Sequence, residues 1–478
     1  MADKKDGHRN SIMAYAVLYA YKFICIILKA LDVRLVAIIG RIVGYAIWAL
    51  MPGRRRIVAR NLRIVTDPTL RADKLRPMVR RNIVRTTMNL ACSLKTGLMK
   101  EREAARSIRM EGADVFEANG SNGHTVVSCI PHAGNWEILA RIRPYFGRVE
   151  HFGSMYRRLA NPLLEDFVYK TRTRYGCEMY SKENGIREVL KVARKGGLLG
   201  VLSDQFTREG VYVPYFGKVT GVTPLPALIY KRCKGKGHLF SVFTRNTGLG
   251  RWDAVLGREI HLPEHCDSVT AITMQVNLAL EKCQRENILD GFWMHHRWKT
   301  TAVIAPEMDD DAIRAIETYG RLPFRIIVCA PESREEMEQM ESTVSKLGSF
   351  RPDAQVTIVC PEAHAAFWRA HEGVTHVVTS DGARSLSAQF DDDAIYKDGP
   401  FDIAFIFNYK KNIYRRLKPL FPLYVTGWAD HPMAHRFNTR YARTSTSPFP
   451  SAEEFAHAIY KSHQIGDGEL LKSARNDN

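Results

Sequence analysis

The fold of this chain is decided by one stretch, Thr125-Val126-Val127-Ser128-Cys129-Ile130-Pro131-His132-Ala133-Gly134-Asn135-Trp136-Glu137. Its first six residues are mostly apolar and rich in β-branched side chains, which predicts a buried strand over Thr125–Ile130. Asn135 is a plausible N-cap, so a helix is predicted from Trp136 onward. A strand that turns directly into a helix is one unit of an α/β sheet. His132 then lies at the carboxyl end of the strand, where open sheets of this class bind their ligands.

The same alternation continues on both sides of this stretch. Residues 54–118 have an amphipathic, helical pattern, and β-rich runs follow at Leu198–Leu202 and Leu239–Thr244. Helical patterns lie between these runs at 161–174 and 184–195. We therefore predict an α/β domain over residues 54–300, with a mixed, mostly parallel sheet flanked by helices.

A second, smaller α/β series begins after a predicted linker at 301–322. Its predicted strands are Phe324–Ala330, Gln355–Cys360, Thr375–Thr379 and Asp402–Phe407. We expect a Rossmann-like domain over 323–466. Residues 467–478 are predicted to be a flexible tail.

Residues 1–53 are predicted to form membrane-associated helices. The apolar run 12–33 is interrupted by Lys22 and Lys29, and a second apolar run covers 35–51. Both have the borderline length for crossing a bilayer. Three placements remain open: helices that lie in the membrane interface with their cations reaching the phosphates, one spanning helix, or a helix in a soluble core.

The charge of the chain is concentrated near its beginning. The formal net charge is +18, and residues 1–110 hold 23 Lys and Arg against 7 Asp and Glu. A cluster of arginines directly follows the second apolar run, at Arg54, Arg55, Arg56, Arg60 and Arg63. A basic cluster beside an apolar segment favours anionic lipid headgroups over nucleic acid and a cytoplasmic placement. We therefore expect an anionic membrane surface as a partner and no nucleic acid.

The nine cysteines indicate a reducing environment. They are widely scattered and form no C-x-x-C pair, so neither a disulfide framework nor a zinc ribbon is predicted. His295 and His296 are adjacent, but no acidic or cysteine partner lies at ligand spacing. We predict no metal and no cofactor.

The residue types of the central stretch suit general base catalysis. His132 can accept the proton of an alcohol, and a carboxylate at Glu137, in the first helical turn, can turn back on the imidazole and fix its tautomer. Gly134 would leave room for a substrate. No G-x-S-x-G nucleophile elbow is present, so direct transfer without an acyl-enzyme is the simpler hypothesis. The alternative is a structural histidine followed by an ordinary capped helix.

The stretch His132–Glu137 resembles the His–four residues–acid motif of the bacterial lipid A biosynthesis acyltransferases, the late lauroyl/myristoyl transferase family. Further blocks resemble that family in the same order, over residues 12–300. They are Arg55, Arg56, Ala59, Arg60, Asn61 and Leu62; then Tyr156–Leu164 with Arg172, Arg174 and Gly176; then Ser203, Asp204 and Gln205 with Val211–Gly217; and His296–Lys299.

This resemblance implies an O-acyltransferase with His132 and Glu137 as its catalytic pair. The donor would be a thioester of acyl carrier protein or coenzyme A. The acceptor would be a hydroxyl of a lipid A-type glycolipid at the cytoplasmic face of the bacterial inner membrane. Two alternatives remain: transfer to a lysophospholipid or another glycolipid, and a non-catalytic membrane scaffold.

Several other residues are candidates for binding the substrate. Arg157 is suited to grip a phosphate, and Asp204 could orient a substrate hydroxyl or position Arg157. The alternative for Arg157 is a place on a solvated basic face, and the alternative for Asp204 is a turn that ends the strand. The full set of predicted substrate-binding residues is Asn135, Arg157, Asn161, Arg172, Arg174, Asp204 and Gln205.

Residues 324–430 resemble, more weakly, the N-terminal half of heptosyltransferase-type glycosyltransferases. The cues are Phe350–Cys360, Asp402–Phe407 and Tyr424–Trp428. The glycine-rich turn expected after the first strand is replaced by Ala330–Ser333, and the nucleotide-sugar half is missing. Recognition of a glycolipid or docking of a protein is therefore favoured over sugar transfer.

Overall fold

The computed structural model describes most of the chain up to residue 441. The described residues are 12–181, 185–207, 209–298, 308–349, 351, 353–379, 398–408, 417, 420, 422–428, 431–434 and 437–441. They fall into two compact units. The first unit takes in residues 1–59, 72–211 and 222–297, and the second takes in 60–71, 212–221 and 298–478. The predicted tail, 467–478, and residues 301–307 of the predicted linker lie outside the described residues.

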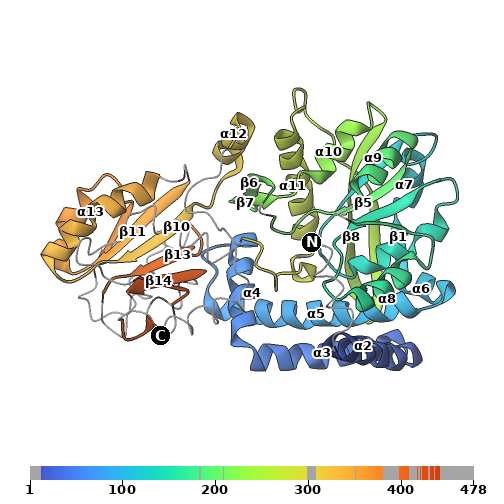
Figure 1. Cartoon of the computed structure of the whole chain (residues 1–478), viewed down its shortest axis with the longest axis horizontal. Coiled ribbons are helices and arrows are strands. Elements are labelled where there is room, and N and C mark those ends of the chain that lie inside the picture. The colour runs from blue at the N-terminus through green and yellow to red at the C-terminus, as the bar shows by residue number, and fades with distance from the viewer. Residues whose placement is uncertain are drawn as a thin grey trace. The chain divides into compact units, whose positions relative to one another are not determined.

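The first unit is built on a seven-stranded sheet in the order β1-β9-β8-β2-β5-β3-β4. Strands β1, β5 and β8 of this sheet are labelled in Figure 1. All neighbours pair in parallel except β8 with β9. The strands are β1 Ile108–Glu111, β2 Thr125–Ile130, β3 Phe152–Tyr156, β4 Glu178–Ser181, β5 Gly197–Leu202, β8 Gly237–Gly248 and β9 Arg251–Glu259. Strand β2 is buried along its whole length, as expected of a central parallel strand covered on both faces.

Helices cover this sheet, and its core is apolar. They are α7 Ala113–Asn119, α8 Pro162–Thr173, α9 Ile186–Lys195, α10 Leu225–Arg232 and α11 Val269–Glu286, with short 3₁₀ helices η1 Trp136–Arg141, η2 Arg143–Tyr145 and η3 Ile288–Asp290. On one side of the sheet Phe116 of α7 packs edge-to-face against Phe146 and Phe240. The predicted α/β fold with a parallel sheet is confirmed. The predicted strands at 198–202 and 239–244 lie within β5 and β8.

The first helices of the chain are α2 Ile12–Ala30, α3 Val33–Leu50, α4 Pro52–Val65, α5 Ala72–Leu98 and α6 Glu101–Ser107. Helix α3 runs alongside α5 (Figure 1) because two glycines let the backbones approach. A Cβ at Gly40 would come within 2.8 Å of the Met88 Cα, and one at Gly44 within 2.7 Å of the Val84 Cα. This small-residue contact fixes the alignment of the two helices.

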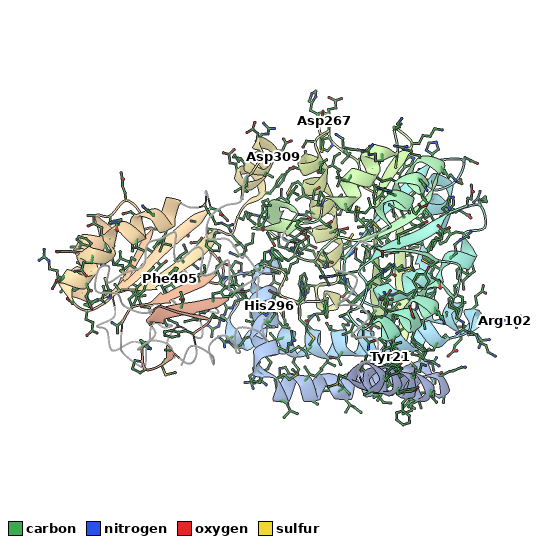
Figure 2. All side chains as sticks on the ribbon, in the orientation of Figure 1. Tyr21, Arg102, Asp267, His296, Asp309 and Phe405 are labelled. Carbon is green, nitrogen blue, oxygen red and sulfur yellow. The ribbon has the colours of Figure 1, made fainter. Side chains whose placement is uncertain are left out.

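Both predicted apolar helices are present, and both expose large apolar side chains. Phe23 and Ile26 on α2, and Ile42 and Leu50 on α3, are all more than 60% exposed. Figure 2 shows the side chains of these helices extending away from the sheet. Among the described residues, α2 and α3 are long and apolar enough to cross a membrane. An apolar face of this size weakly suggests association with a membrane.

The second unit contains a six-stranded, wholly parallel sheet in the order β12-β11-β10-β13-β14-β15. Its strands are β10 Phe324–Cys329, β11 Ala354–Cys360, β12 His376–Thr379, β13 Ile403–Ile406, β14 Tyr424–Trp428 and β15 Thr439–Tyr441. Its helices are α12 Asp310–Tyr319, α13 Arg334–Ser349 and α14 Glu362–Arg369, and a separate ribbon pairs β6 Val211–Tyr215 with β7 Lys218–Val222. The four strands predicted after residue 323 are all present.

A buried ionic cluster joins distant segments within the second unit. The Asp402 carboxylate accepts hydrogen bonds from the Arg60 Nη2 at 2.6 Å, the Lys218 Nζ at 2.8 Å and the Arg325 backbone N–H at 2.8 Å. Residues 60–71 and 212–221 thus belong with residues 298–478, a grouping that differs from the consecutive domains expected from the sequence.

Candidate active site

Strand register brings His132 and Asp204 together. Strands β2 and β5 are parallel neighbours, and Ile130 is paired with Leu202 at their carboxyl ends. His132 and Asp204 each follow by two residues. Since parallel strands end at the same edge of a sheet, both side chains emerge side by side where ligands bind in such folds.

The two side chains form a tight, charge-assisted pair. The His132 Nδ1 lies 2.5 Å from the Asp204 Oδ1, and the His132 backbone N–H donates to Oδ2 at 2.9 Å. The Gln284 Nε2 donates to the same Oδ2 at 3.1 Å. The side chain of His132 is 12% exposed and that of Asp204 8%. A carboxylate on Nδ1 favours the tautomer in which Nε2 carries the free lone pair.

The Asp204 carboxylate stays charged in spite of its burial. Burial opposes the charged form, but His132 and then Arg297 outweigh it and hold the pKa of this carboxyl below its usual range. A charged Asp204 can both orient the imidazole and stabilise it once it is protonated.

The loop that carries His132 is braced from both sides. The Phe292 N–H donates to the His132 carbonyl at 2.8 Å, and the Gly134 N–H donates to the Asp290 carbonyl at 2.9 Å. Gly134 has a φ of +60°, and a Cβ there would come within 2.5 Å of the Thr244 carbonyl oxygen. Our expectation that Gly134 leaves room for a substrate is therefore wrong, because the backbone of β8 occupies that space.

Asn135 plays a different part from the predicted N-cap. Its side chain makes no capping hydrogen bond, and the helix that follows, η1, is a 3₁₀ helix. The buried Asn135 Oδ1 instead accepts a hydrogen bond from the Ser93 hydroxyl of α5 at 2.7 Å. Asn135 therefore ties the loop to α5.

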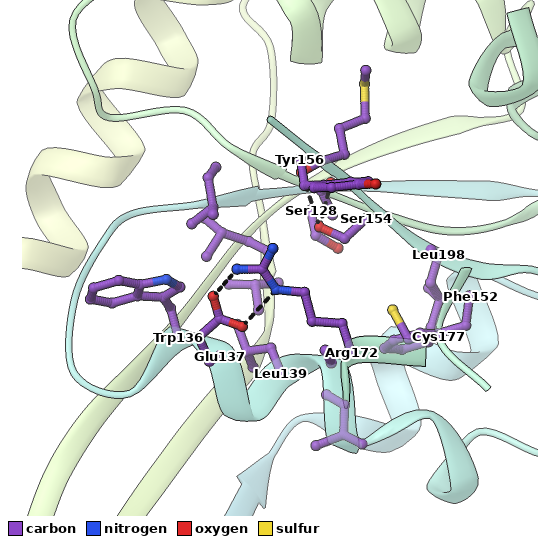
Figure 3. Close-up of a pocket in the computed structure, with 18 of the residues that line it drawn as sticks. Ser128, Trp136, Glu137, Leu139, Phe152, Ser154, Tyr156, Arg172, Cys177 and Leu198 are labelled. Carbon is purple, nitrogen blue, oxygen red and sulfur yellow. Dashed lines mark hydrogen bonds and ion pairs between the residues drawn. The ribbon is translucent and has the colours of Figure 1, made fainter. Parts of the chain in front are cut away.

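Glu137 is bonded to Arg172 and not to the imidazole, contrary to our expectation. The Arg172 Nη2 lies 2.5 Å from the Glu137 Oε1, and the Arg172 Nε lies 3.1 Å from Oε2 (Figure 3). This two-point geometry is the strong form of an arginine–carboxylate pair. Burial opposes the charge on Glu137, but Arg172 outweighs it and holds the pKa of Glu137 below its usual range. The pair joins η1 to α8.

An apolar cavity of about 90 Å³ begins beside this ion pair (Figure 3). The Trp136 side chain lines it and also makes edge-to-face contact with His132, with ring centroids 5.0 Å apart. The polar residues in its lining are Ser128, Glu137, Ser154, Tyr156 and Arg172. The remaining lining is largely apolar and includes Phe116, Ile130, Leu139, Ile142, Phe152, Met155, Leu198, Val242 and Leu256.

The other predicted binding residues are spread more widely. Arg157 is exposed and lines an open groove of about 1010 Å³, which shares Tyr156 and Met179 with the apolar cavity. Asn161 caps α8 through the Leu163 and Leu164 N–H groups and donates to the Ala14 carbonyl of α2 at 3.0 Å. The exposed Arg174 stacks over Tyr175. Gln205 is half-buried directly after Asp204.

Two residues of the site were not predicted. Gln284, on α11, reaches the Asp204 carboxylate, and Phe292 holds the His132 carbonyl. No short motif marks either of them. Their contacts depend on how a distant helix and the loop after η3 pack on the sheet. Among the described residues, no group of three His, Cys, Asp or Glu side chains is placed to hold a metal.

Comparisons with known proteins agree with the sequence resemblance. The profile of the bacterial lipid A biosynthesis acyltransferases matches residues 4–300, which is more than half of the chain. A lipid A biosynthesis acyltransferase of Haemophilus influenzae is 29% identical over 153 residues, or 31% of this chain and 46% of that protein. The chain thus spans about half the length of the curated relative it matches.

Two solved structures show a partial likeness. The ADP-heptose lipopolysaccharide heptosyltransferase II of E. coli matches 29% of this chain and 40% of its own, with a TM-score of 0.22 and 16% identity. A family 9 glycosyl transferase of Veillonella parvula matches 30% of this chain and 42% of its own, with a TM-score of 0.23 and 12% identity.

Proposed function

The chain belongs to the bacterial lipid A biosynthesis acyltransferase family, and from this membership we propose that it moves a fatty acyl group from a thioester onto a hydroxyl of a lipid A-type glycolipid. The observation that carries the proposal is the His132–Asp204 pair, which lies one aromatic side chain away from an apolar cavity. A base beside an apolar cavity is the arrangement that acyl transfer to an alcohol needs.

In the proposed reaction His132 acts as the general base. Its Nε2 takes the proton of the acceptor hydroxyl while the hydroxyl oxygen attacks the thioester carbonyl carbon. The tetrahedral intermediate then collapses, the C–S bond breaks, and the imidazolium returns the proton to the leaving thiolate. The products are an ester and a free thiol, and the enzyme regains its neutral imidazole without an acyl-enzyme.

Asp204 replaces Glu137 as the acid partner in this proposal. It fixes the tautomer through Nδ1 and stabilises the imidazolium during the transfer. Glu137 becomes a positioning residue that, through Arg172, holds η1 beside the cavity. The sequence spacing alone favoured Glu137, whereas the hydrogen-bond geometry favours Asp204.

The apolar cavity would receive the acyl chain of the donor. Each methylene buried there contributes about 0.8 kcal/mol, so such a lining favours a hydrocarbon tail. The open groove with Arg157 adjoins it and would take polar parts of the donor, a thioester of acyl carrier protein or coenzyme A. The exposed apolar faces of α2 and α3 would hold the site at the inner membrane, and the arginine cluster that follows α3 would favour its cytoplasmic face.

Acyl transfer by the purified full chain tests this proposal. Labelled acyl thioesters would be offered with a lipid A-type glycolipid and, separately, with a lysophospholipid. His132→Ala should lower the turnover number by roughly 10²–10⁴-fold while the far-ultraviolet circular dichroism stays unchanged.

His238→Ala is the matched control. The His238 Nδ1 also lies against a carboxylate, 2.8 Å from the Glu259 Oε1. However, His238 stands at the amino end of β8, which is the edge of the sheet opposite to the one that carries His132. It should keep the wild-type rate. Normal turnover by folded His132→Ala protein would refute the mechanism, and product formed only from the lysophospholipid would refute the proposed acceptor.

A further inference from the structure

A second polar groove in the first unit lies where α3 and α5 meet the end of β8, and it is lined by arginines. It has a volume of about 510 Å³, and its lining includes Arg41 of α3 and Arg80, Arg81 and Arg85 of α5. No carboxylate is among the residues that line it. Arg41, Arg80 and Arg81 are exposed, and Arg85 is half-buried.

The close approach of the two helices explains why the cations converge. Gly40 and Gly44 bring the backbones of α3 and α5 into contact at Met88 and Val84. Arg41 and Tyr45 directly follow these glycines, so they stand beside the contact. On α5, Arg81 lies one helical turn from Arg85, whose guanidinium is paired with Asp290 at 3.2 Å. The exposed Arg41, Arg80 and Arg81 are therefore the cations that an anion in the groove would meet first.

The groove is bounded by a helix that exposes apolar side chains. Ile38, Ile42 and Tyr45 of α3 are 42%, 63% and 47% exposed, and Tyr45 and Arg41 also line the groove. An anion bound there would lie at the level of an apolar surface. A phosphate that is covalently attached to hydrocarbon chains meets both conditions, because its chains can lie against α3 while its charge meets the arginines.

We propose that this arginine groove binds the phosphate group of an anionic membrane lipid. Arginine suits the role because its planar donors pair with two phosphate oxygens at once. Two sources share this chemistry: the phosphorylated acceptor itself and an anionic phospholipid of the surrounding membrane.

The groove is linked to the catalytic loop through Asp290. The Arg85 Nε lies 3.2 Å from the Asp290 Oδ1, and the Asp290 carbonyl accepts the Gly134 N–H. Asn246 also lines the groove, and its backbone N–H donates to the Asp290 Oδ2 at 2.8 Å. A phosphate held by the arginines would therefore stand next to the segment that positions the loop of His132. Assigning that phosphate to the acceptor rests on the proposed function.

The test measures lipid retention separately from turnover. The full chain, purified in detergent, would be mixed with phosphatidic acid or with phosphatidylcholine of the same acyl chains, and bound lipid would be counted by native mass spectrometry. Wild-type protein should retain phosphatidic acid preferentially. Arg41→Gln/Arg81→Gln should lose about tenfold of that affinity, since each exposed arginine contributes a several-fold effect.

Arg187→Gln/Arg194→Gln is the matched control. It removes the same charge from two exposed positions of α9, outside the groove, and should leave retention unchanged. Equal retention of the two lipids by the wild type, or unchanged phosphatidic acid affinity in Arg41→Gln/Arg81→Gln, would overturn the proposal.

The acyl-transfer assay then separates the two sources. A KM advantage of a phosphorylated over a dephosphorylated glycolipid that disappears in Arg41→Gln/Arg81→Gln assigns the groove to the acceptor. Loss of phosphatidic acid retention with an unchanged KM assigns it to a membrane phospholipid. Absence of transfer in the wild type with every acceptor would refute the proposed function, whereas the retention result would still decide the groove.

Discussion

Two buried aspartates, one in each unit, differ in where they stand on a parallel sheet. Asp204 follows the carboxyl end of β5, and its partner His132 keeps 12% of its side chain exposed. Asp402 precedes the amino end of β13, and its partners Arg60 and Lys218 are only 5% and 2% exposed. Both carboxylates accept several hydrogen bonds, but only Asp204 holds a group that can exchange a proton near a cavity.

The difference shows that the end of the strand at which an aspartate stands decides whether its ion pair can take part in catalysis or only in stability. Carboxyl ends of parallel strands face the crevice in which α/β proteins bind ligands, whereas the amino ends do not. A sealed cluster such as that of Asp402 is stabilising only while every partner is present, because each charge has lost its hydration. We therefore expect opposite consequences when the two aspartates are changed.

The largest effect is expected for Asp204→Asn on catalysis. An asparagine amide can donate to Nδ1, which would leave the proton on Nε2 and remove the base. The turnover number should fall by roughly 10²–10⁴-fold, while the protein remains folded. Steady-state kinetics with saturating donor and acceptor measure this, and a rate within a few-fold of wild type would break the comparison.

Asp402→Asn should act on stability in place of catalysis. The substitution removes the negative charge that compensates Arg60 and Lys218, and both cations stay buried. The free energy of unfolding should therefore fall by about 3–5 kcal/mol. Urea unfolding gives this free energy, and hydrogen exchange should show lost protection in β10 and β13. Asp311→Asn, which alters a surface pair with Arg314, is the control and should change little.

The loss of stability at acid pH tests the structural role of Asp402 in a second way. Burial opposes the charge on Asp402, but Lys218 and Arg60 outweigh it and hold the pKa of Asp402 below its usual range. A lowered acid pKa contributes stability that is present above the unfolded value of about 3.9 and lost as the pH falls toward the folded value. Wild-type protein should therefore lose more stability below about pH 4 than Asp402→Asn does. If the free energy of unfolding of the two proteins fell equally with pH, the charge of Asp402 would contribute nothing to stability.

The sequence located His132 but not its partner, for a physical reason. Periodicity identified β2 and β5, and the loop after each was a candidate site, yet which strands are neighbours depends on packing across the whole sheet. Glu137 was favoured because it is close to His132 in sequence. Asp204 lies 72 positions after His132, so no local pattern indicates their contact. Likewise no local pattern predicts that Arg60 and Lys218 meet Asp402, because a buried ion pair leaves no periodic signature.

The smallest effect, and the sharpest test of the catalytic pair, is expected for Glu137→Gln. A glutamine side-chain oxygen can still accept a hydrogen bond from Arg172, so η1 should stay close to its place beside the cavity. Because Glu137 does not contact the imidazole, the turnover number should fall less than about tenfold, with most of the change in the KM of the thioester. If Glu137→Gln instead lost 10²-fold or more in turnover number while Asp204→Asn did not, the acid partner of His132 would be the carboxylate five residues along the chain, and strand register would not have built the site.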